Sequence, residues 1–232
     1  MKTRTRQLIL WLSIGLNFGI YIHLLSVREF LKRIFDIFVS LPMTVLLLPV
    51  FAVIVIAIRV SSKGPAIFKQ ERAGKDGVPF TFYKFRTMKV GVEPFGSSPK
   101  SGDDPRLTKI GKFLREYSLD ELPQLFNVLK GDMSIVGPRP LYVSQMAEWN
   151  ERQKKRLLVK PGLTGLAQIS GRGGLTREEK LELDVKYVKT ANLWVDLKII
   201  LKTIAQVFSR KSIYEKRYSQ TEYTRGENSN SE

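Results

Sequence analysis

Two adjacent carboxylates, Asp120 and Glu121, are the residues of this chain whose types and setting best suit chemistry. They stand at the predicted start of an apolar helix over residues 122–129. The N-terminus of a helix favours an ionised aspartate. Such a carboxylate could attack a phosphate as a nucleophile, or hold a magnesium ion that bridges to the phosphates of a substrate.

The same residues have a purely structural explanation. Ser118 and Glu121 have the spacing of a capping box, and acidic residues favour the first turn of a helix. Pro123 also fits best within a first turn, which favours a cap nearer Asp120. From this local pattern alone, capping is favoured over catalysis.

A rigid turn follows the acidic pair. In Gly137-Pro138-Arg139-Pro140, two prolines fix the backbone around one arginine. A guanidinium matches the geometry of a phosphate with two parallel hydrogen bonds. Arg139 is therefore a candidate phosphate ligand, and the alternative is a rigid turn with a solvated arginine.

Other cations and one glycine-rich segment are weaker candidates. About two or three of five basic side chains are expected to reach a substrate. The segment 162–172 permits close backbone approach to a ligand, and its Gln168 and Arg172 could bind a nucleotide or a sugar. The five basic candidates are Lys84, Arg86, Arg106, Lys109 and Arg115.

Composition limits the chemistry and the partners. The 232 residues carry a formal net charge of +16, which implies an anionic partner such as nucleic acid, anionic lipid or a phosphorylated substrate. The absence of cysteine excludes disulfides and thiolate chemistry, and a single histidine, His23, makes a histidine triad or metal cluster very improbable. A general base must then be a carboxylate, a lysine or a tyrosine.

The N-terminal quarter of the chain is hydrophobic. Residues 1–27 predict a membrane-embedded or interfacial segment, and residues 28–36 predict a basic amphipathic helix whose Lys and Arg groups reach lipid phosphates. The uncharged run 37–58 would form a helix about 33 Å long, enough to cross a bilayer. Pro49 interrupts it and predicts a kink.

The charges around this run bear on its topology. Cations stand on both sides of it, Lys32 and Arg33 before it and Arg59 and Lys63 after it, against a simple positive-inside span. A helix that bends at Pro49 and returns to the same face would satisfy both flanks. From charge and proline alone, this re-entrant helix and an ordinary transmembrane anchor are about equally favoured.

The remaining chain predicts a small α+β domain that is mostly helical. Alternating runs at 65–70 and 79–88 with a turn at 74–77 predict a β-hairpin. Helical patterns are predicted at 107–117, 122–129, 141–159, 177–189 and 193–208. The predicted organisation is a hydrophobic segment 1–27, a membrane segment 28–60, a catalytic domain 61–213 and a disordered tail 214–232.

Taken together, these segments resemble the bacterial sugar transferase family, the monotopic phosphoglycosyl transferases of glycoconjugate assembly. The matching segments occur in order over roughly residues 30–210, and such an ordered set overrides the local preference for capping. They are residues 32–36, 83–88, 104–111, 118–134, 137–140, 160–165 and 182–187.

The resemblance implies a reaction. An enzyme of this family transfers a phosphosugar from a UDP-sugar to undecaprenyl (polyprenyl) phosphate and releases UMP, which initiates exopolysaccharide or glycoconjugate biosynthesis. It implies that Asp120 is the nucleophile of a covalent aspartyl-phosphosugar intermediate, that Mg²⁺ binds at Asp120 and Glu121, and that Arg139 binds phosphate. Lys84, Arg86 and Arg115 are the further phosphate-binding candidates that we retain.

The resemblance also implies a place in the cell. The family's hydrophobic segment is a re-entrant helix–break–helix, here with Pro49 at the break, which anchors the catalytic domain on the cytoplasmic face of the bacterial inner membrane. The implied partners are the UDP-sugar, the polyprenyl phosphate and membrane lipid, and the amphipathic helices leave room for a homodimer. The alternative function is a non-catalytic, membrane-tethered scaffold that binds anionic lipid. Nucleic-acid binding is not expected, because the charge is scattered and the aromatic residues lie in apolar runs.

Overall fold

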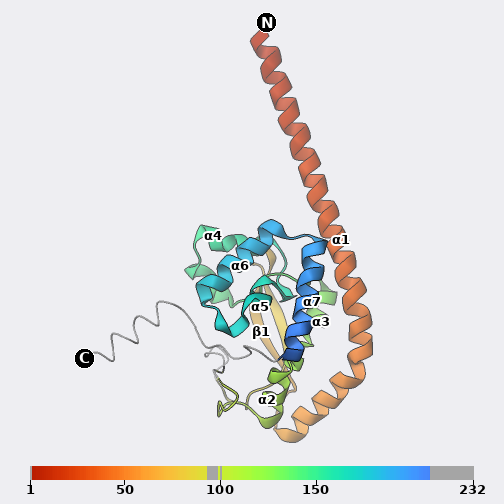
Figure 1. Ribbon diagram of the computed structural model, residues 1–232, viewed down its shortest axis with the longest axis vertical. Coiled ribbons are helices and arrows are strands. Elements are labelled where there is room, and N and C mark those ends of the chain that lie inside the picture. Colours follow the sequence, from red (N-terminus) through yellow and green to blue (C-terminus); the bar gives the residue numbers. More distant parts are fainter. Residues whose placement is uncertain (1, 93–98, 100, 210–232) are drawn as a thin grey trace, which may run out of the picture.

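The computed structural model describes residues 2–92, 99 and 101–209, and of residues 2–26 and 208–209 it describes only the helical backbone. The chain forms one long N-terminal helix and a small domain of short strands and helices (Figure 1). In chain order the elements are α1 Lys2–Ser61, β1 Ile67–Ala73, η1 Lys75–Gly77, β2 Pro79–Phe85, α2 Lys109–Glu116, η2 Leu119–Glu121, α3 Gln124–Lys130, β3 Ser134–Val136, η3 Val143–Glu148, α4 Glu151–Lys154, η4 Lys155–Leu158, β4 Gly162–Thr164, α5 Leu166–Ser170, η5 Arg172–Gly174, α6 Arg177–Thr190 and α7 Leu193–Ser209, where η marks a 3₁₀ helix.

Helix α1 runs without a break through both hydrophobic segments that the sequence separates at residue 27. Pro42 and Pro49 both lie inside it, and Figure 1 shows the helix bending towards its C-terminal end as it passes under the domain. A proline removes one backbone hydrogen bond and clashes with the preceding turn, which accounts for a bend. The re-entrant hairpin itself stays a prediction.

The second half of α1 has two different faces. Phe51, Ile54 and Ile58 are buried and belong to the main core of the domain. Large apolar side chains on the other face are exposed, among them Phe38 and Leu46 at 77% and 78%. Within the described residues, Val27–Ser61 is long and apolar enough to cross a membrane. The helix is therefore part of the domain along one side and unpartnered along the other.

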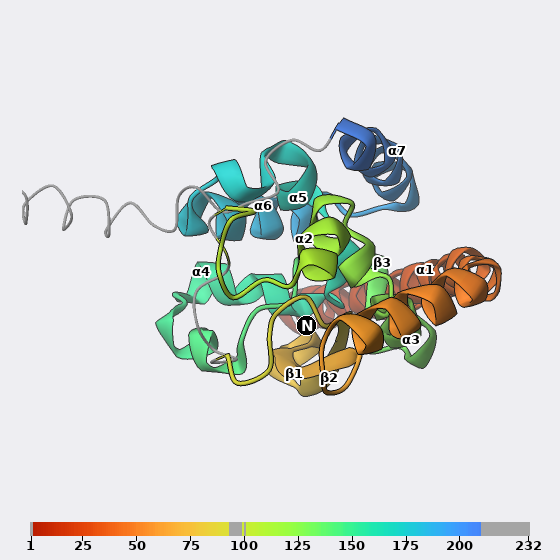
Figure 2. The same ribbon diagram turned by 90° about the horizontal axis from the view of Figure 1, so that it is seen from below.

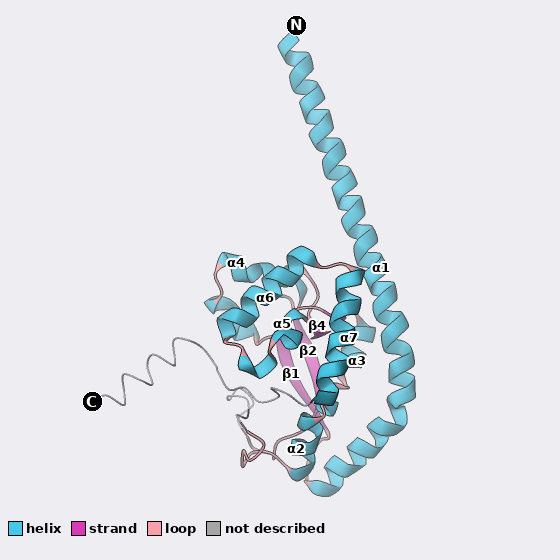
Figure 3. Cartoon of the chain, viewed as in Figure 1, coloured by secondary structure: helices cyan, strands magenta, loops and turns pink. Residues whose placement is uncertain are grey.

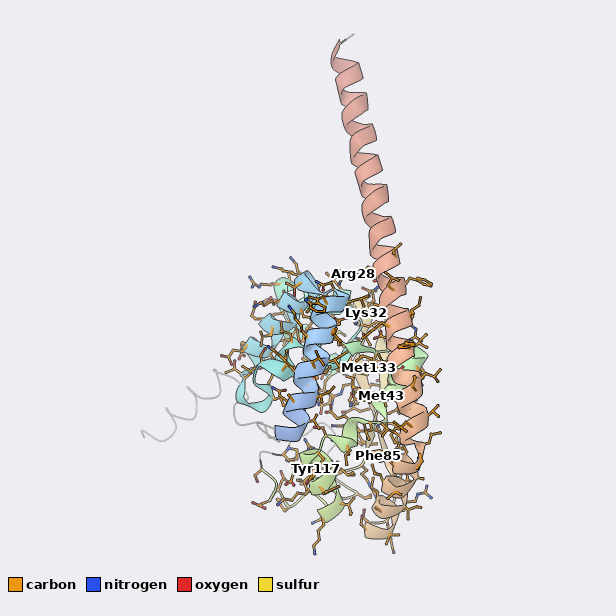
Figure 4. All side chains as sticks on the ribbon, turned by 45° about the vertical axis from the view of Figure 1, so that its right-hand side comes forward. Arg28, Lys32, Met43, Phe85, Tyr117 and Met133 are labelled. Carbon is orange, nitrogen blue, oxygen red and sulfur yellow. The ribbon has the colours of Figure 1, made fainter. Side chains whose placement is uncertain are left out.

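Two cations at the basic start of this helical stretch contact other parts of the domain. Nζ of Lys32 lies 2.6 Å from Oδ2 of Asp196 on α7, and Figure 4 labels Lys32 beside the domain. Arg33 donates to the carbonyls of Val128 and Leu129 at the C-terminal end of α3, at 2.5 and 2.6 Å. An acidic side chain and orphan helix carbonyls thus bind Lys32 and Arg33 within the protein. Contact between this segment and lipid phosphates stays a prediction.

The same network fixes α1 against the centre of the domain. The carboxylate of Asp36 accepts hydrogen bonds from the hydroxyl of Ser134 and the backbone N–H of Ile135, both at 2.9 Å. The hydroxyl of Tyr187 donates to Asp196 at 2.7 Å, and its ring is almost fully buried. Each of these buried polar groups is thus satisfied, as a packed interior requires.

The predicted β-hairpin is confirmed. Strands β1 and β2 pair antiparallel with Ile67 opposite Phe85 and Ala73 opposite Pro79. The turn contains Asp76 and Gly77, both with positive φ, as a tight connection between twisted strands demands. Figure 3 shows the strands at the centre of the domain with helices around them.

A second, parallel pair of strands was not predicted. Ser134 of β3 pairs with Gly162 of β4, and Val136 pairs with Thr164. Three-residue strands are too short to show an alternating pattern, and a parallel pair joins segments distant in sequence. The glycines here are needed for close packing, since a Cβ on Gly165 would lie 2.1 Å from the carbonyl oxygen of Gly137.

The helices at 109–116, 124–130, 177–190 and 193–209 confirm four helical predictions within about two residues at each end. The helical stretch predicted over 141–159 is confirmed in part, because it is helical in three short pieces, η3, α4 and η4, and not in one continuous helix. Figure 2 shows α1 and α3 near the hairpin, with α5, α6 and α7 gathered on the other side of the domain.

The described chain is a mostly helical α+β structure, as predicted. The predicted tail 214–232 lies outside the described residues.

Candidate active site

The acidic pair lies in a short turn of its own. Asp120 and Glu121 belong to η2, and the helix α3 starts only at Gln124. Ser118 precedes the turn with φ of 56° and its side chain forms no capping hydrogen bond. The capping-box explanation is therefore wrong for Ser118, whose left-handed backbone does not place the hydroxyl over the following N–H groups.

This turn brings both carboxylates to one cation. Nζ of Lys84 lies 3.1 Å from Oδ2 of Asp120 and 3.8 Å from Oε1 of Glu121. Lys84 comes from strand β2, which contacts the turn, and its side chain is only 18% exposed. Asp120 is 4% exposed. Neighbouring acids on an α-helix would point apart, whereas this turn makes them converge on Lys84.

Arg139 reaches the glutamate of the same pair. Its Nη2 lies 2.5 Å from Oε1 of Glu121 and its Nη1 lies 3.3 Å from Oε2. The turn between Gly137 and Pro140 directly follows strand β3, which places the arginine at the dyad. The guanidinium fork therefore holds Glu121 with two hydrogen bonds.

Charge sets the protonation state of Glu121. Burial alone would raise the pKa of this carboxyl, but the charges of Arg139 and Lys84 and the hydrogen bonds from Arg139 outweigh it and lower the pKa to about 2. The glutamate is consequently ionised throughout the physiological range.

Arg172 is a third cation at the dyad. Its positive charge interacts electrostatically with the carboxylates of Glu121 and Asp120. Its Nη2 donates to the hydroxyl of Ser118 at 3.3 Å. Burial lowers the pKa of this guanidinium below its ordinary value. Arg172 and Ser118 both have positive φ, at 49° and 56°. Two strained residues in contact beside an acidic pair are typical of a functional site.

Two predicted phosphate ligands have other partners. Arg86 is buried and donates to the carbonyls of Lys63 and Ser62 at 2.6 and 3.0 Å, just after the end of α1. The charge of Arg115, on α2, is among the interactions that lower the pKa of Asp104. The structure thus brings Lys84 and Arg139 to the dyad, whereas the described contacts of Arg86 are at the end of α1.

Gln168 lies on α5, beside the packed glycines that support the arginine turn. A Cβ on Gly165 would lie 2.9 Å from the side-chain oxygen of Gln168. Among the described residues, both polar atoms of this amide are buried without a hydrogen-bond partner. Such an amide can still donate and accept hydrogen bonds towards a ligand.

Three charged residues near the site were not among the predicted site residues, although Asp184 lies in the family-matching segment 182–187. Arg72 of β1 stacks 3.7 Å from the ring centroid of Tyr142, and burial lowers its pKa to about 10. Arg156 and Asp184 form a buried ion pair at 2.7 Å that touches the backbone of Arg139. Both arginines stand in basic stretches that look solvated, so the sequence contains no signal that separates them from surface charges.

The dyad has the donor chemistry of a magnesium site. Carboxylate oxygens are the ligands that Mg²⁺ prefers, and the ammonium of Lys84 already bridges Asp120 and Glu121. The described residues include no group of three or more His, Cys, Asp or Glu side chains placed to hold a metal ion. A magnesium ion at the dyad would thus complete its shell with water and substrate oxygens, which is its usual behaviour.

Comparison with known proteins identifies the family of this chain. The model of the family described as bacterial sugar transferase matches residues 27–210. The uncharacterized sugar transferase EpsL of Bacillus subtilis is 46% identical over 187 residues, which cover 79% of this chain and 90% of EpsL. The family model matches the second half of α1 as well as the domain.

Two longer proteins are also similar. The galactosyl transferase CpsE of Streptococcus agalactiae is 43% identical over 84% of this chain and 45% of its own length. The UDP-glucose:undecaprenyl-phosphate glucose-1-phosphate transferase of Klebsiella pneumoniae is 46% identical over 79% of this chain and 41% of its own length. The chain spans less than half the length of these two relatives. From the extent of these matches, the chain belongs to the bacterial sugar transferase family.

Proposed function

We propose that this chain transfers a phosphosugar from a UDP-sugar to undecaprenyl phosphate and releases UMP. The observation that carries the proposal is the convergence of Lys84, Arg139 and Arg172 on buried Asp120 and half-buried Glu121. Three cations around two carboxylates leave a positive site that attracts a diphosphate. The similar protein from Klebsiella, named for this class of reaction, supports the same assignment.

In the first step, a carboxylate oxygen of Asp120 attacks the phosphorus that bears the sugar. A bond forms between that oxygen and phosphorus, and the bond from phosphorus to the oxygen shared with the uridylyl phosphate breaks. The bonding electrons leave with UMP, and the phosphosugar stays on Asp120 as an acyl phosphate. Oδ1 is the attacking oxygen we assign, because Oδ2 is the one nearest to Lys84.

In the second step, a phosphate oxygen of undecaprenyl phosphate attacks the same phosphorus. The acyl-phosphate bond breaks, the carboxylate of Asp120 is regenerated, and the product is the sugar-diphospho-undecaprenol. Because one nucleophile serves two substrates in turn, the kinetics are ping-pong. Lys84 and Arg139 stay in place in both steps and stabilise negative charge on the phosphoryl oxygens.

Asp120 and Glu121 would hold Mg²⁺ through their carboxylate oxygens. When bound, the ion adds charge stabilisation at the phosphate oxygens. The fork from Arg139 keeps Glu121 ionised and fixed in orientation. Gln168 and Arg172 are the side chains that we assign to the nucleotide or the sugar, since the amide of Gln168 has no hydrogen-bond partner among the described residues.

We infer that the long helix anchors the domain to one face of the bacterial inner membrane, on the cytoplasmic side. Both ends of the apolar stretch contact the same domain. Near its start Lys32 pairs with Asp196, and just after its end the carbonyls of Ser62 and Lys63 accept hydrogen bonds from Arg86. A helix held to one domain at both ends favours a bent, re-entrant course over a crossing.

A UMP-release assay tests the proposed function. The full chain in membranes or detergent is incubated with undecaprenyl phosphate, Mg²⁺ and a panel of UDP-sugars. We expect UMP in amounts equal to the lipid-linked sugar formed. If the chain binds membranes but releases no UMP from any UDP-sugar, it is a lipid-binding scaffold. The acidic pair surrounded by cations does not favour this alternative.

A further inference from the structure

A buried ion pair lies directly behind the arginine turn. Arg156 of η4 and Asp184 of α6 have side chains only 2% and 4% exposed. Nε and Nη2 of Arg156 donate to Oδ2 of Asp184 at 3.1 and 2.7 Å. The guanidinium also lies 4.9 Å from the ring centroid of Trp149. The arginine is thus held on two sides and has one fixed orientation.

The same guanidinium holds the backbone of the phosphate-site arginine. Nη2 of Arg156 donates to the carbonyl oxygen of Arg139 at 2.5 Å. The neighbouring carbonyls of Pro138 and Leu141 are held by the backbone N–H groups of Gly162 and Ala73, both at 2.9 Å. Of these three carbonyls, that of Arg139 is held by the side chain of Arg156, and the other two are held by main-chain N–H groups.

The turn needs such support from outside. Pro138 and Pro140 have no backbone N–H, so the segment cannot fix itself through donors of its own on either side of Arg139. With its carbonyl fixed, the side chain of Arg139 starts from a defined point and reaches Glu121 with two hydrogen bonds. Fixing a backbone in this way reduces the freedom of the side chain that it carries.

Stability alone is a poor explanation for this ion pair. Desolvation makes buried ion pairs costly, and replacing one with packed apolar side chains is often neutral or favourable. Among the described residues, Oδ1 of Asp184 is buried without a hydrogen-bond partner, which adds to the cost. A costly pair that contacts the backbone of a substrate-binding residue suggests a role in orienting that residue.

We propose that Arg156 and Asp184 are positioning residues, which orient the guanidinium of Arg139 towards Glu121 and the phosphates of the substrate. The inference rests on the proposed function, in which Arg139 stabilises charge on the transferred group. Neither positioning residue touches the substrate. Their effect passes through the carbonyl of Arg139.

The chain offers a matched control pair. Arg152 of α4 donates to Glu182 of α6 at 2.6 Å, so this pair joins nearly the same two segments as Arg156 and Asp184. The control side chains are 64% and 44% exposed, and the described contacts of Arg152 are to Glu182. Arg152→Gln removes an ion pair without disturbing the arginine turn.

The test is a double-mutant cycle on kcat/KM for UMP release. Arg156→Gln is expected to lower kcat by about 100-fold, the cost of a misplacement of about 1 Å, with KM changing much less. In an Arg139→Ala background there is no guanidinium to orient, so the same change should lower kcat/KM by less than about threefold. Arg152→Gln should have no effect in either background.

A second variant tests whether a loss of activity arises only from a loss of folding. Arg156→Met combined with Asp184→Leu removes both buried charges at similar volume, and should keep the melting temperature of the domain while losing activity as Arg156→Gln does. Equal losses from Arg156→Gln in both backgrounds would mean a merely structural role and would overturn the inference. The proposed function is judged separately, by UMP release from the wild-type chain and by its loss in Arg139→Ala.

Discussion

Nζ of Lys84 lies 3.1 Å from Oδ2 of Asp120, so a lysine of the β-hairpin faces an acidic residue of the turn that precedes α3. Both side chains are mostly buried, at 18% and 5% exposure, which strengthens their attraction relative to a surface pair. The pair fixes the carboxylate that we assign as nucleophile and leaves its other oxygen for phosphorus. The first two predictions test the two sides of this contact.

Asp120→Asn is expected to abolish turnover, because an amide cannot form the acyl phosphate. Expression and membrane association should persist. Wild-type protein incubated with a UDP-sugar labelled in the phosphosugar, without undecaprenyl phosphate, should carry the label on Asp120 by mass spectrometry. Asp103→Asn is the control, since this carboxylate is 91% exposed, and should be silent. Appreciable turnover in Asp120→Asn would remove the covalent mechanism.

Lys84→Met is expected to lower kcat/KM by about 100- to 1,000-fold, the loss seen when one preorganised electrostatic group is removed. Lys84→Arg should retain part of the activity, because it keeps the charge with a different shape. The control is Lys69→Met, which changes an exposed lysine on the neighbouring strand β1. Steady-state rates of UMP release measure all three, and wild-type rates for Lys84→Met would contradict a role for this ammonium.

Metal removal separates the roles of the dyad. We expect EDTA to abolish UMP release and Mg²⁺ to restore it. If Glu121 binds the ion, Glu121→Gln should raise the Mg²⁺ concentration for half-maximal activity by at least about tenfold. Since the pKa of Glu121 is held at about 2, its protonation should not weaken Mg²⁺ binding in the wild type between pH 5 and 8. An unchanged Mg²⁺ requirement in Glu121→Gln would place the ion elsewhere.

Arg86→Met is expected to destabilise the domain by about 1.5–3 kcal/mol. The substitution removes a buried charged donor, so the carbonyls of Ser62 and Lys63 lose their hydrogen bonds from it. The folded fraction should retain the kcat/KM of the wild type. Thermal unfolding followed together with UMP release distinguishes this from a catalytic role. Arg59→Gln, at an exposed position in the last turn of α1, should change stability by only a few tenths of a kcal/mol.

Cysteine labelling tests the course of α1. The chain has no cysteine of its own, so Glu29→Cys and Lys63→Cys each introduce one exposed thiol, and Lys155→Cys reports the side on which the domain lies. A maleimide that cannot cross membranes should label all three only after the cells are permeabilised. Labelling of Glu29→Cys or Lys63→Cys alone in intact cells would mean that the helix crosses the membrane.

The sequence by itself determined the local elements and the chemical candidates. Alternating residues around Gly77 defined the hairpin, and helical spacing defined α2, α6 and α7, because these signals depend on near neighbours. The adjacent acids at Asp120 and the proline-flanked Arg139 stood out through residue types that chemistry uses. Those features survive in the structure because each depends on a few consecutive residues.

Only the tertiary structure decided which charges meet. Lys84, Arg86 and Arg115 look alike in the sequence, yet Lys84 faces Asp120 while Arg86 binds the carbonyls after α1. Arg156 stands in a basic run and is nevertheless buried against Asp184. The parallel pairing of β3 and β4 likewise joins distant segments. A cation binds the nearest uncompensated acceptor in space, and that distance is set by how the elements pack and not by the residue types along the chain.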